Sequence, residues 1–307
     1  MKLAFVFPGQ GSQAIGMLKA YAGLDAVAKI RAQAEGALGG EFVRILDEGP
    51  AESLNLTVNT QPAMLAAGYA AYSAWRSLGG RVPDVMAGHS LGEYTALAAA
   101  GCIPFIEALP LVRFRAKAMQ EAVPPGKGAM AAILGLDDQN VREACVEALG
   151  DVQAVNFNAP GQIVIAGEAK AVERAALLCK SRGAKRAMPL PVSAPFHSSL
   201  MKPAGEALKP YLQKLTLNSP QVPVINNVDV AAETRPDDIR HALVRQAYSP
   251  VRWVETVQKM QVEGVTHIYE CGPGKVLAGL TRRIAPEIRS AALADRASIE
   301  EALKEQA

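Results

Sequence analysis

Residues 85–94 constrain the fold more than any other stretch of this 307-residue chain. An apolar run leads into Gly88-His89-Ser90-Leu91-Gly92, and a run of helix-forming residues follows. This spacing is typical of a sharp strand-to-helix turn, in which glycines leave room for backbone that passes close by. The serine hydroxyl projects from such a turn beside the free N–H groups of the helix. The segment therefore predicts an α/β fold with Ser90 as a nucleophile, although 26 glycines also allow a purely structural turn.

Composition narrows the class of protein. Half of the residues are hydrophobic, 20% are charged and the net charge is +2, a balance typical of globular proteins and not of nucleic-acid binders. The four cysteines are scattered without a C-x-x-C pair, which predicts free thiols in a reducing compartment: Cys102, Cys145, Cys179 and Cys271. The first apolar run ends at Pro8-Gly9, too early for a signal peptide, and no segment is long enough to span a membrane. We therefore expect a cytoplasmic protein that binds neither nucleic acid nor membrane.

The order of apolar runs and helical stretches predicts a parallel sheet. Buried strands are expected at 3–7, 82–87, 223–227 and 266–271, with helices at 16–38, 60–78, 103–123, 236–245, 251–263 and from 297 onward. The helix at 60–78 would have Pro62 in its first turn. Residues 8–13, which follow the first strand, are rich in turn formers and amides. A loop in that place commonly contributes to a site in α/β proteins.

The middle of the chain has a different order of predicted strands and helices. The run Pro124-Pro125-Gly126 marks a boundary. Strands predicted at 129–134, 152–158, 162–166 and 184–190, with helices at 138–149 and 169–182, follow in the order βαββαβ, which is the ferredoxin-like pattern. We therefore expect a small domain, 126–192, inserted into a large domain made of 1–125 and 193–307.

A serine nucleophile needs a base, and His197 is the best-placed candidate because it lies in a loop at the domain junction, just before a helix. His89, His241 and His267 are expected to be structural. The acids between Ser90 and His197 do not follow an obvious strand, unlike the Ser–acid–His order of typical α/β-hydrolases. A backbone carbonyl or an amide is therefore expected to orient the imidazole.

Two arginines in one predicted helix compete for a place in the cleft. Arg113 and Arg115 would lie about 200° apart around the helix axis, so at most one of them faces the cleft. A solvated charge is the ordinary role of a single arginine on a helix. The helical spacing alone does not decide between them.

Several segments together resemble the malonyl-CoA:acyl carrier protein transacylase family. They lie in the family's order from residue 5 to about 285: Phe7-Pro8-Gly9-Gln10-Gly11-Ser12-Gln13, Gly88-His89-Ser90-Leu91-Gly92-Glu93-Tyr94, Arg115-Ala116-Lys117-Ala118-Met119-Gln120, Asn156-Phe157-Asn158, Phe196-His197 and Tyr269-Glu270-Cys271-Gly272-Pro273-Gly274. The resemblance implies an α/β-hydrolase-like large domain with a ferredoxin-like insertion, in agreement with the pattern above.

The resemblance also implies residue roles. Ser90 would carry the malonyl group, with His197 as base and then as acid. The backbone N–H groups of Gln10 and Leu91 would form the oxyanion hole, and the backbone carbonyl of Gln246 would orient the histidine. A further role would fall to Arg115, whose planar guanidinium suits a bidentate pair with the malonyl carboxylate. Phe196 would crowd out an α-methyl group on the acyl chain.

The implied reaction moves malonyl from malonyl-CoA to the phosphopantetheine thiol of acyl carrier protein, supplying fatty acid synthesis. The enzyme would need no cofactor or metal of its own, and we expect a monomer. A basic rim would suit the acidic carrier, with Lys275, Arg282, Arg283, Lys185 and Arg186 as candidates. Three alternatives stay open: a serine thioesterase or hydrolase, an inactive carrier-docking module, and a loading enzyme of a polyketide pathway.

Overall fold

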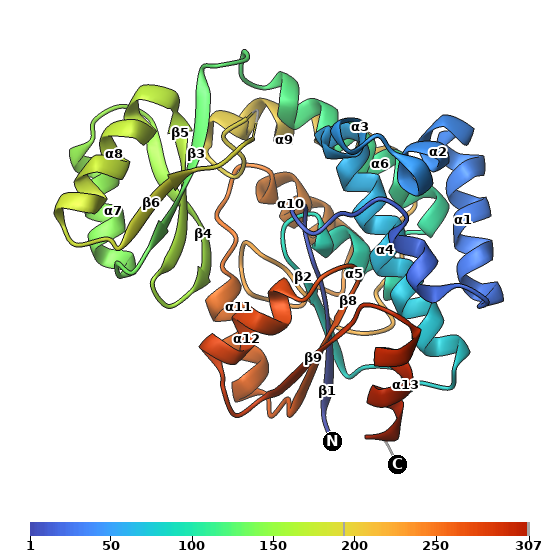
Figure 1. Ribbon diagram of the computed structural model, residues 1–307. Coiled ribbons are helices and arrows are strands. Elements are labelled where there is room, and N and C mark those ends of the chain that lie inside the picture. The colour runs from blue at the N-terminus through green and yellow to red at the C-terminus, as the bar shows by residue number, and fades with distance from the viewer. Residues whose placement is uncertain (193, 306–307) are drawn as a thin grey trace.

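The computed structural model describes residues 1–192 and 194–305. The predicted domain boundary at residue 193 and the last two residues of the predicted terminal helix lie outside this range. Two parts are visible in Figure 1, a larger one built around a five-stranded sheet and a smaller one built around a four-stranded sheet.

The sheet of the larger part is parallel throughout, as predicted. Its strands are β1 (Leu3–Phe7), β2 (Val85–Gly88), β7 (Val224–Ile225), β8 (His267–Cys271) and β9 (Arg289–Leu293), in the order β7-β2-β1-β8-β9. The central strand β1 is buried along its whole length. Strands covered on both faces are apolar at every position, which explains why residues 3–7 form a continuous apolar run.

Helices cover both faces of this sheet. Leu3, Phe5 and Phe7 point into a core shared with helices of one layer, and Ala4 and Val6 point into the core of the other layer. The first layer contains α4 (Thr57–Ser77), α5 (Gly92–Ala99), α6 (Phe105–Glu121) and α13 (Arg296–Lys304), and the second contains α11 (Trp253–Val262) and α12 (Val276–Ile284).

The remaining helices of the larger part pack around these layers. They are the 3-10 turn η1 (Met17–Tyr21), α1 (Asp25–Leu38), α2 (Gly40–Glu48), α3 (Ala51–Asn55), the 3-10 turn η2 (Ser199–Met201), α9 (Lys202–Lys214) and α10 (Pro236–Gln246). α1 contacts α4 and α6, whereas α9 contacts α6 and α10. This arrangement holds α6 between its neighbours, which matters because α6 carries both candidate arginines.

The starts expected for α4 and β2 were wrong, and one strand was not predicted. α4 begins at Thr57, so Pro62 lies inside the helix and not in its first turn. Thr60 lies in the first turn of the helix, and its hydroxyl is within hydrogen-bond distance of the Leu54 and Leu56 carbonyls. β2 begins at Val85, since Val82 is 45% exposed and Pro83 has no N–H to donate. Strand β9 was not predicted at all; it lies at the edge of the sheet, where small half-buried residues give a weak apolar signal.

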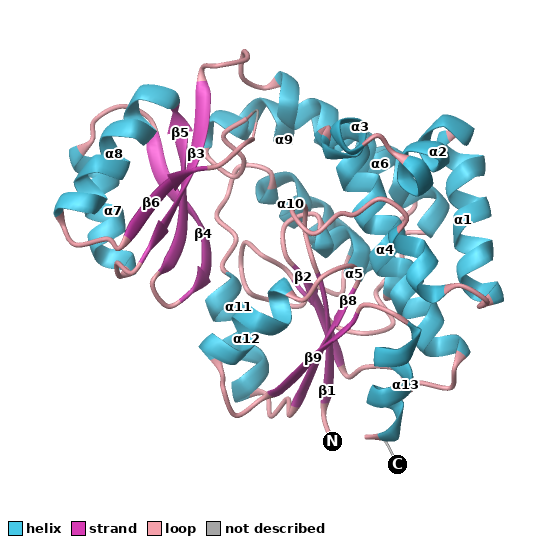
Figure 2. Cartoon of the chain, in the orientation of Figure 1, coloured by secondary structure: helices cyan, strands magenta, loops and turns pink. Residues whose placement is uncertain are grey.

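The smaller part follows the predicted order of elements. Its elements are β3 (Gly128–Leu134), α7 (Asp138–Glu147), β4 (Val152–Ala159), β5 (Gln162–Glu168), α8 (Ala169–Ser181) and β6 (Arg186–Pro189), with an antiparallel strand order β4-β5-β3-β6. Figure 2 shows α7 and α8 on the face of this sheet that is turned away from the larger part. Along β5, Ile163 and Ile165 join the core under these helices, whereas Val164 and Ala166 face a different core.

That second core joins the two parts. Val164 shares it with Met119 of α6 and with Phe196 and Met201, which belong to the larger part. The backbone makes a further link, because the Val251 N–H donates to the Val155 carbonyl at 2.8 Å and its carbonyl accepts from the Phe157 N–H at 3.0 Å. The two parts are therefore joined by packing and by paired backbone.

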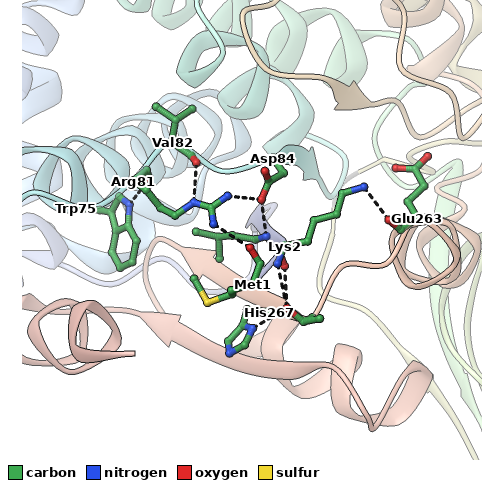
Figure 3. Close-up of polar contacts among 10 residues, drawn as sticks. Met1, Lys2, Trp75, Arg81, Val82, Asp84, Glu263 and His267 are labelled. Atoms are coloured by element: carbon green, nitrogen blue, oxygen red, sulfur yellow. Dashed lines mark hydrogen bonds and ion pairs between the residues drawn. The ribbon is translucent and has the colours of Figure 1, made fainter. Parts of the chain in front are cut away.

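Polar contacts tie together the amino-terminal ends of the central strands (Figure 3). The Asp84 carboxylate accepts from the Leu3 N–H at 2.7 Å and also contacts the Arg81 guanidinium. Lys2 donates from Nζ to the Glu263 carbonyl at 2.7 Å. Ligands of open α/β sheets bind at the opposite, carboxyl edge, so we infer that the contacts at this edge stabilise the fold.

Among the described residues, no helix combines the length and hydropathy needed to cross a membrane.

Candidate active site

The turn between β2 and α5 has the geometry predicted from its glycines. A Cβ atom on Gly88 would overlap the backbone of Gly92, and one on Gly92 would overlap the carbonyl oxygen of Phe7. Ser90 adopts a left-handed backbone conformation with φ of 53°, a strained state for a residue with a side chain. Asn227 supports it by accepting from the Ser90 N–H at 2.8 Å and donating to the Gly88 carbonyl at 2.7 Å.

Ser90 and His197 come together although 107 positions separate them in the chain. The Ser90 Oγ lies 2.7 Å from His197 Nε2, and His197 Nδ1 lies 2.9 Å from the carbonyl oxygen of Gln246. Because a carbonyl only accepts, Nδ1 carries the proton and Nε2 presents its lone pair to Ser90. His197 is 3% exposed, and burial together with the nearby Arg115 charge lowers its pKa to about 3. The imidazole is therefore neutral at neutral pH.

Arg115 lies in the same pocket and is 1% exposed. Its guanidinium donates to the Gln61 Oε1 at 2.8 Å and to the Gln246 Oε1 at 2.9 Å. A third contact joins Nη2 to the Ser90 Oγ at 3.2 Å, and the cation lies 5.2 Å from the ring centre of Tyr94. Burial lowers the pKa of Arg115. A buried cation without an ion pair to any described residue is suited to receive an anionic ligand.

Arg113 points elsewhere. It donates to Asn59 Oδ1 at 3.2 Å and lies over the Phe42 ring at 5.6 Å. Arg113 does not line the pocket that contains Ser90. Only one of the two arginines reaches the site, in keeping with their separation around the helix.

The pocket has a volume of about 140 Å³ and lies between the two parts. Ser90, His197 and Arg115 form its polar side together with Gln10 and Leu91. The apolar side comes from both parts of the molecule, namely Met119, Met130, Leu190, Val192 and Phe196.

Gln10 and Leu91 each bring an unused backbone donor to this pocket. Gln10 follows β1, and Leu91 is the residue before α5. Neither N–H makes a hydrogen bond within the described part of the chain. Two such donors beside a nucleophile are the arrangement that stabilises an oxyanion.

Sequence reasoning missed the polar support around these residues. Glu93, which directly follows the turn, had seemed only a helix former, yet it is 2% exposed and accepts from Gln246 Nε2 at 3.0 Å and from the Asn227 N–H at 2.9 Å. Burial raises the pKa of Glu93 to about 7. Gln61 and Asn227 were missed as well, because amides in a helix and a loop carry no local signal of a role.

His89 and His267 make no hydrogen bond to Ser90, His197 or Arg115, although His89 lines the same pocket. His89 pairs through Nε2 with Asn158 Oδ1 at 2.8 Å, while His267 lies at the amino-terminal edge of the sheet. No cluster of three or more His, Cys, Asp or Glu side chains in the described residues would suit a metal ion. The arrangement is suited to nucleophilic attack by a serine beside a buried cation.

Known proteins share both the sequence and the fold. The family described as acyl transferase domain matches residues 4–282. The malonyl CoA-acyl carrier protein transacylase of Escherichia coli strain K12 is 54% identical over 306 residues, which cover 99% of each chain. The crystal structure of an acyl-carrier-protein S-malonyltransferase from Burkholderia pseudomallei 1710b is 59% identical, with a TM-score of 0.97 over 99% of this chain and all of that one.

A third similar structure contains a partner. It is described as a type II PKS acyl-carrier protein in complex with its malonyl-transacylase, and it is 51% identical to this chain, with a TM-score of 0.97 over 99% of this chain and 100% of that one. Identity this high over whole chains goes well beyond a shared fold. This chain belongs to the acyl transferase family and, within it, to the malonyl-CoA:acyl carrier protein transacylases.

Proposed function

We propose that this chain transfers the malonyl group of malonyl-CoA to the phosphopantetheine thiol of acyl carrier protein, through an ester on Ser90, and so supplies fatty acid synthesis. One observation carries the proposal: the Ser90 Oγ contacts both His197 Nε2 and the Arg115 guanidinium. A nucleophile, its base and a group that binds a carboxylate thus meet at one atom. The Arg115 contact favours a carboxylated acyl group, and the similarity to transacylases over the whole chain favours the carrier thiol over water as the acceptor.

In the first half-reaction, the Ser90 Oγ would attack the thioester carbonyl while His197 Nε2 takes the hydroxyl proton. The Gln10 and Leu91 N–H groups would hold the developing oxyanion, and the Gln246 carbonyl would keep the imidazole in the required tautomer. His197 would then return the proton to the departing CoA sulfur, leaving malonyl on Ser90.

The substrate carboxylate would help its own transfer. The charge of Arg115 is one of the causes that lower the pKa of His197. A malonyl carboxylate paired with that guanidinium offsets the charge, so the imidazole becomes a better base when malonyl is bound. A neutral acyl group offers no such compensation.

In the second half-reaction, the carrier thiol would give its proton to His197 and attack the ester carbonyl; the bond to the Ser90 Oγ would then break, with His197 returning the proton to that oxygen. The phosphopantetheine belongs to the carrier, so we propose that the enzyme has no cofactor or metal of its own. Of the basic residues considered for carrier docking, Arg283 instead contacts Gln162 and the Pro160 carbonyl. Lys275, Arg282, Lys185 and Arg186 stay candidates.

Phe196, with Met119 and Met130, would set acyl selectivity. These side chains line the apolar side of the pocket. Since the pocket is small, we propose that the ring of Phe196 excludes an α-methyl group.

We also infer the domain organisation. The strand–turn–helix unit at Ser90 on a parallel sheet supports an α/β-hydrolase-like domain of residues 1–125 and 193–307. The antiparallel order β4-β5-β3-β6 with two helices on one face supports a ferredoxin-like insertion at 126–192. We expect a monomer and, from four buried free cysteines and the proposed role in fatty acid synthesis, a cytoplasmic location.

The test is the intact mass of the protein after brief exposure to malonyl-CoA, followed by a chase with carrier protein. One added malonyl group, absent in Ser90→Ala and transferred to the carrier, is the expected result. A group that is lost without any thiol would make the protein a hydrolase. If no group is ever attached, the Ser90 turn is only structural or the acyl donor is not malonyl-CoA, and labelling with methylmalonyl-CoA distinguishes the two.

A further inference from the structure

Glu93 is hydrogen-bonded to Gln246 and Asn227, the two residues that hold the backbone of Ser90. Its Oε2 accepts from the Gln246 Nε2 and from the Asn227 N–H. The same Gln246 Nε2 donates to the Ser90 carbonyl at 2.9 Å, and the Asn227 Oδ1 accepts from the Ser90 N–H. Both backbone groups of the strained Ser90 are therefore held by residues that contact Glu93.

Gln246 connects this carboxyl group to the rest of the site. Its backbone carbonyl accepts from His197, and its side-chain Oε1 accepts from Arg115. A guanidinium only donates and a carboxylate only accepts, so the two charges fix the orientation of the amide between them. A change at Glu93 would release that amide and, with it, the support for Ser90.

The charges around Glu93 indicate that its carboxylate balances the positive charge of Arg115. Arg115 faces it from α6, with Gln246 between them. The negative charge of Asp229, in the loop after β7, contributes to raising the pKa of Glu93. Glu233 and Glu93 both line a small cavity of about 10 Å³. Asp229 is itself paired with Arg245, so its charge is partly compensated. Arg115 is the cation that remains for Glu93 to balance.

We propose that Glu93 is a positioning residue that orients Ser90 and His197 through Gln246 and Asn227, and that its negative charge supports the positive charge His197 acquires in each half-reaction. This inference rests on the proposed function. The Gln246 carbonyl orients His197 directly, and the Glu93 carboxylate acts one step further away, through the Gln246 side chain.

A pH dependence follows. Burial raises the pKa of Glu93 to about 7, whereas His197 has a pKa of about 3. Below pH 7 the carboxyl is protonated and its support for positive charge is lost; above pH 7 it is ionised. The rate of Ser90 acylation should therefore rise with pH through about 7, and this rise belongs to Glu93 and not to His197.

The experiment compares Glu93→Gln with a matched control, Glu270→Gln. Glu270 is also fully buried with a raised pKa, but it accepts from the Ala278 N–H in α12 and makes no contact with the site. The rate constant of Ser90 labelling is measured by intact mass, with malonyl-CoA and with acetyl-CoA, from about pH 5.5 to about pH 9.

Above pH 8, Glu93→Gln should label about tenfold more slowly than the wild type with both donors, and its rate should no longer rise through pH 7. Glu270→Gln should keep the wild-type pH profile. Glu93→Asp, which keeps the charge, should keep the rise at a lower rate, and it provides the test if Glu93→Gln does not fold.

Two results would overturn the inference: a wild-type profile that is flat between about pH 6 and pH 8, or a Glu93→Gln profile that matches the wild type. In either case Ser90 would still be labelled. A wild-type protein that takes no label contradicts the proposed function itself, so the two failures are distinguishable.

Discussion

Arg115 and Arg113 show how strongly the surroundings of a side chain decide its role. They are two positions apart on α6, yet one is buried against Ser90 and the other stacks over Phe42. A planar guanidinium binds a carboxylate through two parallel hydrogen bonds, so the buried arginine is suited to select malonyl. One of its present partners is the neutral amide of Gln61, which a carboxylate would replace, so that the contact with Gln246 is kept.

We predict that Arg115→Ala slows malonyl transfer to Ser90 by about ten- to a hundredfold, because a charge-assisted pair is lost, and changes acetyl transfer far less. The measurement is the labelling rate with each CoA ester. Arg113→Ala, on the same helix, should leave both rates near wild type. An equal fall for the two esters would show that Arg115 is structural.

The unit formed by β2, the turn and α5 shows why two glycines flank Ser90. The backbone of α5 passes so close to Gly88, and the end of β1 so close to Gly92, that no side chain fits at either position. The turn aims the Ser90 Oγ at His197, and it places Leu91, whose N–H makes no hydrogen bond within the described residues, in the lining of the pocket.

We predict that Gly88→Ala destabilises the protein by about 2 kcal/mol or more, since the backbone of Gly92 must move. Gly36→Ala is the matched control: it lies exposed in α1, a Cβ there meets nothing within 4 Å, and the change should stabilise by about 0.5–1 kcal/mol. Denaturant unfolding measures both. Equal effects would mean that the close approach at Gly88 is not limiting.

At the scale of the whole molecule, the pocket exists only because the two parts pack against each other. The smaller part contributes Met130 to the pocket, and the segment that follows β6 contributes Leu190 and Val192. The larger part contributes Ser90 and Arg115. The core around Val164 spans this boundary next to the pocket. Separate unfolding of the smaller part would expose that core, so we expect the two parts to unfold together.

Both tryptophans, Trp75 and Trp253, lie in the larger part, so their fluorescence reports on that part while far-UV circular dichroism reports on the whole chain. We predict that the two unfolding curves coincide. Val164→Ala, in the smaller part, should shift both by about 1–3 kcal/mol. A shift confined to circular dichroism would show that the parts unfold independently.

Local patterns in the sequence determined much of this protein. The glycine spacing predicted the turn at Ser90, the apolar runs predicted the parallel sheet, and the alternation after residue 126 predicted the order of elements in the smaller part. The absence of a well-placed acid before His197 also predicted that a backbone carbonyl or an amide orients the imidazole. These are properties of short segments, in which sterics and burial act on neighbours in the chain.

Only the tertiary structure decided the network around Glu93. Gln246 is 153 positions away from it and Asn227 is 134, so no local pattern links the three. The edge strand β9 was missed for a related reason. Its residues have only a weak preference for a strand, and it forms because it pairs with β8. Hydrogen bonds between distant segments depend on where the fold places them, and a carboxylate in a helix has the same local sequence whether it faces water or the active site.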